Sequence, residues 1–69
     1  MKLTKTQIEL VKELDFYSTD KIVIQHILHM LDTSRKVEQM KNYLKENHEK
    51  KLTQSQIILK ANQLQTGKN

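Results

Sequence analysis

The sequence predicts an all-α fold, a small bundle of four short helices in a single domain. Apolar residues recur at intervals of three and four along most of the chain, which is the spacing of an amphipathic helix. The chain has no proline and one glycine, Gly67, so few residues interrupt such helices. A length of 69 residues allows one small domain. We expect residues 1–66 to form that domain and residues 67–69 to be a flexible tail, with Gly67 ending the last helix.

The first helix is expected to begin at Thr4 and to end near Asp15 or Phe16. Thr4 and Gln7 have the spacing of a capping box, in which each side chain bonds the other residue's free backbone N–H. The apolar residues of this segment share one side of the predicted helix: Leu3, Leu10, Val11 and Leu14.

Residues 22–31 form the densest apolar segment and predict a second helix at the centre of the bundle. Ser18 is expected to cap this helix, with Asp20 in its first turn. Tyr17 and Ile22 then flank the cap at the positions of a hydrophobic staple. The apolar face is wide enough to contact more than one neighbour: Val23, Ile24, Ile27, Leu28, Met30 and Leu31.

The third helix is predicted to follow a connection of three capping residues, Asp32, Thr33 and Ser34, any of which suits the cap. Its outer faces are heavily charged, and residues 47–51 after it are polar and predict a loop. Its apolar residues form only a narrow seam: Val37, Met40 and Leu44.

Thr53 and Gln56 repeat the capping box and predict the start of a fourth helix, with Leu52 and Ile57 as its staple. The apolar residues Ile57, Ile58, Ala61 and Leu64 group together, whereas Leu59 points away from them. Apolar residues therefore surround more of this helix than a one-sided core needs.

Composition argues against several classes of protein. The chain has no cysteine, so it has no disulfide framework and no cysteine zinc site, which suits a reducing, cytoplasmic compartment. No apolar run approaches the roughly 20 residues of a membrane span, and the basic start lacks the apolar stretch of a signal peptide. Richness in Lys, Ile, Asn and Gln is typical of an AT-rich bacterial or phage genome.

No stretch has the pattern of a catalytic or cofactor site. The serines lie at predicted helix starts, where capping is their expected role, and no glycine-rich phosphate loop is present. We therefore expect a protein that is not an enzyme and has no cofactor, no small-molecule substrate and no membrane partner. His26 and His29 have a spacing that suits two metal ligands, but no third ligand is fixed near them, so we expect no metal site.

The main functional hypothesis is a small regulatory or adaptor protein that binds another protein or a second copy of itself. An apolar helix face beyond the needs of the core is typical of such a surface. We expect this surface on the fourth helix, at Ile58, Leu59 and Gln63.

The alternative hypothesis is a DNA-binding regulator with a helix-turn-helix over residues 18–47. The net charge of +4 lies mainly in the second half of the chain, although a small domain typically carries such a charge for solubility. The turn has no glycine, and the third helix also carries glutamates that would repel DNA. The residues that would contact phosphates or bases are Arg35, Gln39, Lys41, Asn42 and Lys45.

Overall fold

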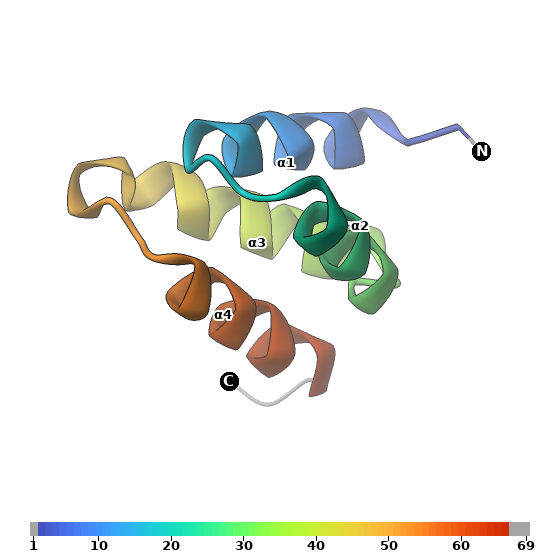
Figure 1. The fold of residues 1–69 in the computed structure, drawn as a ribbon. Helices are drawn as coiled ribbons and strands as arrows, with labels where there is room; N and C mark the ends of the chain where they lie inside the picture. The colour runs from blue at the N-terminus through green and yellow to red at the C-terminus, as the bar shows by residue number, and fades with distance from the viewer. Residues whose placement is uncertain (1, 67–69) are drawn as a thin grey trace.

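The computed structural model describes residues 2–66, which form four α-helices and one short 3-10 helix (Figure 1). The prediction of an all-α bundle of four helices is confirmed. The predicted tail and the role of Gly67 lie outside the described residues. The elements are α1 (Lys5–Phe16), α2 (Lys21–Met30), α3 (Ser34–Glu46), η1 (His48–Lys50) and α4 (Gln54–Thr66).

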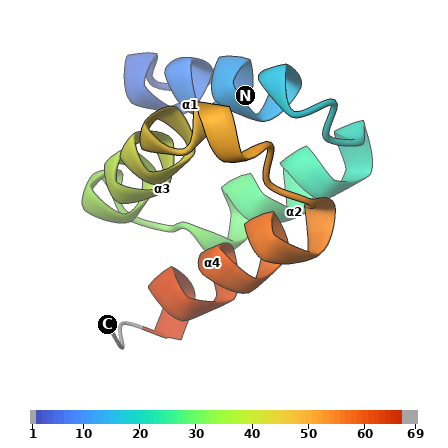
Figure 2. The ribbon, with the colours of Figure 1, turned by 90° about the vertical axis from the view of Figure 1, so that its left-hand side faces the viewer.

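The most extensive helix pair is α1 with α3, and α4 packs against both α3 and α2. Figure 1 shows α1 and α4 on opposite sides of α3, and Figure 2 shows α2 beside α4. The central position expected for the segment 22–31 therefore belongs to α3, because the narrow seam of α3 is buried between α1 and α4. The wide apolar face of α2 contacts α4 and α1, while its edge residues Val23 and Leu28 stay half-buried.

One cluster of buried apolar side chains, drawn from all four α-helices and the segments between them, forms the core. Each fully buried Leu or Ile contributes about 1.5–3 kcal/mol by leaving water, so this cluster is the main source of stability. Its members are Leu10, Leu14, Ile24, Ile27, Met30, Leu31, Val37, Met40, Leu44, Leu52, Ile57, Ala61 and Leu64.

The helix α1 ends at Phe16, as expected, but Ser18 does not begin the next helix. Ser18 adopts a left-handed backbone conformation with φ of 57° and so cannot be the N-cap of α2. The N–H of Ser18 bonds the carbonyl of Asp15 at 2.9 Å, and the N–H of Thr19 bonds the carbonyl of Leu14 at 3.1 Å. These two bonds form a Schellman motif, in which Ser18 occupies the position that glycine usually takes.

The predicted cap and staple of α2 are therefore wrong. Asp20 is the N-cap, without a side-chain hydrogen bond, and Ile22 is 80% exposed rather than packed against Tyr17. The helix ends at Met30, one residue before the predicted end. Tyr17 contacts α3 instead, and its hydroxyl donates a 2.6 Å hydrogen bond to the carbonyl of Leu44.

The remaining helix starts follow the capping chemistry of the sequence. The box at Thr4 and Gln7 is formed as predicted. Among the three candidates for α3, Thr33 is the cap, and its hydroxyl accepts from the N–H of Lys36. At α4, Thr53 and Gln56 form the second box, with bonds of 2.8 and 3.2 Å.

Candidate protein-interaction surface

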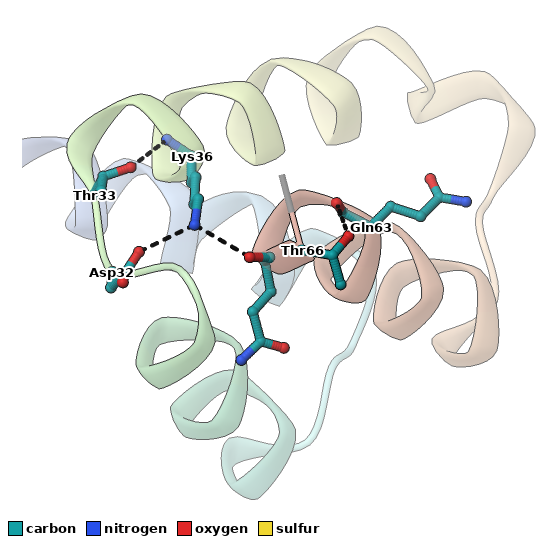
Figure 3. A network of polar contacts seen from close by, with 6 residues as sticks. Asp32, Thr33, Lys36, Gln63 and Thr66 are labelled. Carbon is teal, nitrogen blue, oxygen red and sulfur yellow. Dashed lines mark hydrogen bonds and ion pairs between the residues drawn. The ribbon is translucent and has the colours of Figure 1, made fainter. Parts of the chain in front are cut away.

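The helix α4 is held at both ends, so its orientation on the bundle is well defined. At its start, the Gln54 amide donates to the carbonyl of Tyr17 at 3.3 Å, in addition to the capping box. At its end, the Lys36 ammonium donates to the carbonyl of Gln65 at 3.2 Å and pairs with Asp32 at 3.3 Å (Figure 3). A cation at this place also suits the negative end of the helix dipole.

Buried residues on one side of α4 fix which side faces solvent. Ile57, Ala61 and Leu64 are buried in the core, and Leu52 just before the helix joins them. The opposite side carries six exposed residues, which we call the uncharged face: Ser55, Gln56, Leu59, Asn62, Gln63 and Thr66. On a helical projection these positions span about 120°, with Leu59 in the middle.

The uncharged face differs in chemistry from the other helices. Lys60 is the one charged residue between Gln54 and Thr66, and its ammonium lies 4.9 Å from the centre of the Tyr43 ring, beside the face. Exposed positions of α1 and α3 carry both acids and bases, and those of α2 include Lys21 and two histidines. Depletion of charge around an exposed apolar side chain is the composition typical of an interface centre.

A shallow hollow runs along one edge of the uncharged face. Its lining comes from α4 and from α3, which supplies Tyr43. The Tyr43 ring offers a flat apolar wall, and Lys60 is drawn over it by a cation–π interaction. The lining residues are Tyr43, Gln56, Leu59, Lys60 and Gln63.

The structure places the three residues predicted for a protein interface as follows. Leu59 is 58% exposed, Gln63 is exposed beside it, and Ile58 is half-buried at the border of α4 with the core. Sequence reasoning missed Gln56 and Tyr43. The spacing of Gln56 from Leu59 and Gln63 already placed it on the same side of the helix, whereas the contribution of Tyr43 depends on how α3 meets α4.

The five residues predicted to contact DNA do not form one group. Arg35, Gln39 and Asn42 are exposed on the outer side of α3, and Lys45 is exposed at its edge. Lys41 instead faces α1, where it pairs with Glu9 at 3.4 Å and with Glu38 at 4.0 Å. These carboxylates offset the charge that Lys41 would bring to a phosphate.

The proposed helix-turn-helix also has an unusual arrangement. The main packing partners of α2 are α4 and α1, and α2 makes only limited contact with α3, its neighbour in the motif. A recognition helix is normally braced by the helix that precedes it.

A second apolar spot, which the sequence did not predict, lies where α1 meets η1. Phe16 is 57% exposed, and its ring stacks on His48 with 4.2 Å between ring centres. His48 in turn bonds Glu13 at 2.5 Å, so η1 is tied to α1. Phe16 therefore has a partner within the chain for one face of its ring.

No known protein family, curated protein or solved structure matches this chain.

The described residues contain neither a candidate metal site nor a helix that could span a membrane. Within residues 2–66 no three His, Cys, Asp or Glu side chains come together in a way that could hold a metal ion. His26 and His29 are both exposed on α2. Among the helices described, none combines the length and apolarity needed to cross a membrane.

Proposed function

We propose that this chain is a small non-enzymatic regulatory or adaptor protein that binds a protein partner through the uncharged face of α4. A cytoplasmic location is part of the proposal and rests on the absence of cysteine. The observation that carries the proposal is Leu59, a half-exposed apolar side chain at the centre of a face without charge.

Single exposed leucines are common on protein surfaces and need no explanation alone. The surroundings of Leu59 distinguish it. Its neighbours on α4 are amides and hydroxyls, which hydrogen-bond a partner without the desolvation cost of a buried charge. The helix is also fixed at both ends, by the Thr53 box and by Lys36, so binding would order little additional backbone.

The proposal is tested by affinity capture from the cells that make this protein. Wild type is compared with Leu59→Glu, which places a charge at the centre of the face, and with Ile22→Glu, which changes an equally apolar and more exposed residue of α2. We expect wild type and Ile22→Glu to capture the same proteins, and Leu59→Glu to capture at least tenfold less of them. A tenfold loss corresponds to the removal of about 1.4 kcal/mol of binding energy.

Circular dichroism of both variants supplies the control for folding. Because Leu59 and Ile22 are exposed, both variants should keep the helicity of wild type. An identical capture profile for wild type and folded Leu59→Glu would remove α4 from consideration as the binding surface.

We propose DNA binding through α3 as the second candidate function. It is favoured by one observation: Arg35, Gln39 and Asn42 are exposed together on the outer side of α3. These residue types contact phosphates and base edges in the major groove. Salt titration against duplex DNA separates this candidate from binding through α4.

A further inference from the structure

We infer that the partner of the uncharged face is a second copy of this chain, packed α4 against α4 about a two-fold axis at Leu59. The inference rests on the proposed function and names the occupant of that surface. Ser55, Asn62 and Gln63 carry hydroxyl or amide groups that can both donate and accept hydrogen bonds. The Gln56 oxygen accepts from Thr53 in the capping box, so Gln56 offers its amide N–H groups as donors. A face of such groups is complementary to itself, whereas a face with charges of one sign is not.

Charge selects this face among the surfaces of the molecule. Two copies, each with a net charge of +4, repel one another at long range. Close approach costs least where no charge has to be desolvated or brought near a like charge, and α4 offers such a surface. The single lysine of α4, Lys60, lies over the Tyr43 ring at the edge of the face, in the hollow that Leu59 also lines.

Spacing along α4 supports an antiparallel arrangement. When Leu59 lies on the axis, residues equally far from it on the two helices face each other. Ser55 then meets Gln63 of the partner, and Gln56 meets Asn62, so hydroxyl faces amide and amide faces amide. Antiparallel packing also places each helix N-terminus beside the partner's C-terminus, which is the favourable order of the helix dipoles.

The size of the face sets the expected strength. A helix of 13 residues is about 20 Å long. One face of a helix of this length buries less than the roughly 800 Å² that each partner buries in a standard interface. We therefore expect a weak dimer with a dissociation constant of roughly 10 µM or higher. Tyr43 at the edge of the hollow enlarges the contact beyond α4 itself.

Sedimentation equilibrium of the purified chain tests the inference directly. Over a range from about 10 µM, the lower limit of the expected dissociation constant, to about 1 mM, the mass of wild type should rise toward that of two chains. Leu59→Glu and Leu59→Lys should each stay monomeric, because residues on a two-fold axis meet their own copies and like charges would face each other. A one-to-one mixture of the two variants should recover the dimer, because opposite charges then meet.

The matched controls are Ile22→Glu and Ile22→Lys on α2. Both should dimerise as wild type does, alone and mixed. A monomeric wild type at the highest concentration would overturn the inference, and so would dimers that survive in Leu59→Glu or that Ile22→Glu abolishes. Failure of the mixture to recover association would likewise exclude a two-fold axis at Leu59.

The outcome distinguishes this inference from the proposed function. If wild type is monomeric while affinity capture still finds a protein that depends on Leu59, the uncharged face binds a different partner and only the second-copy inference fails. If neither experiment depends on Leu59, both fail.

Discussion

At the scale of single residues, Ser18 illustrates how a helix ends where no glycine is available. Its backbone is left-handed, a conformation that costs a non-glycine residue about 1–2 kcal/mol, and the Schellman bonds to Asp15 and Leu14 hold it there. Within residues 2–66, Lys51 is the other non-glycine residue with positive φ, at 50°. Both residues, together with Phe16, line one shallow hollow, so the turn after α1 and the turn before α4 lie close together.

Ser18→Gly is expected to stabilise the fold. Glycine removes the steric cost of the left-handed conformation but adds entropy to the unfolded chain, so the net gain should be about 0.5–1 kcal/mol. In a domain of this size, 1 kcal/mol shifts the melting temperature by about 4–8 °C. Thermal unfolding followed by circular dichroism measures the gain. Ser34→Gly, at a helical position of α3, should give no increase; a Ser18→Gly variant no more stable than wild type would contradict the account.

At the scale of elements, Tyr17 joins α1 to α3 across the core. Its half-buried ring brings the hydroxyl to the carbonyl of Leu44 at 2.6 Å, near the end of α3. Burial raises the pKa of Tyr17 above its usual value of 10.0, and the negative charges of Glu13 and of ionised Tyr43 raise it further. The neutral hydroxyl is therefore the form that the folded chain favours.

The sign of the resulting pH dependence follows from the raised pKa. Stability supplied by neutral Tyr17 is complete below the unfolded pKa of about 10 and is lost as pH rises through the folded value. Tyr17→Phe should cost about 1 kcal/mol at neutral pH, through the lost hydrogen bond. Urea unfolding of both proteins at pH 7 to 11 should show the advantage of wild type shrinking above about pH 10.

Tyr43→Phe is the control for this experiment at neutral pH. The Tyr43 hydroxyl forms no hydrogen bond with another described residue, so its removal should change stability less than Tyr17→Phe does. A difference between wild type and Tyr17→Phe that stays constant across the whole pH range would show that Tyr17 ionises no less readily in the folded chain than in the unfolded chain.

At the scale of the whole molecule, charge and salt separate the two candidate functions. Binding to DNA releases counterions and weakens steeply as salt rises. Association through an uncharged face releases no counterions, and salt screens the repulsion between two positively charged copies. The α4 dimer should therefore tighten slightly with added salt, whereas a DNA complex should weaken.

The DNA candidate is tested by titrating labelled duplex DNA at several salt concentrations. An Arg35→Ala, Lys45→Ala variant is expected to bind more weakly, with a log–log salt slope shallower by about 1 for each phosphate contact removed. Lys41→Ala should have a smaller effect, because Glu9 and Glu38 already neutralise Lys41. Equal slopes for wild type and the double variant would exclude α3 as the DNA-binding surface.

Local chemistry explains why the starts of α1 and α4 could be predicted from the sequence, and why the start of α3 could be narrowed to three residues. The boxes at Thr4 and Thr53 and the cap at Thr33 form between residues three apart, so no distant part of the chain is needed to specify them. The same holds for the side of α4 that Leu59 occupies, since helical periodicity alone separates it from Ile57 and Leu64.

Contacts between distant segments decided the remaining features. Ser18 ends α1 instead of starting α2 because packing of Tyr17 and Thr19 fixes the turn, and capping propensity cannot compete with that burial. Lys41 was predicted to contact DNA, but in the folded chain its ammonium pairs with Glu9, which lies 32 residues away in the sequence. Tyr43 joins the edge of the uncharged face for the same reason. Hydrogen bonds within one helix turn depend on neighbouring residues alone, whereas burial and charge pairing depend on how the helices meet.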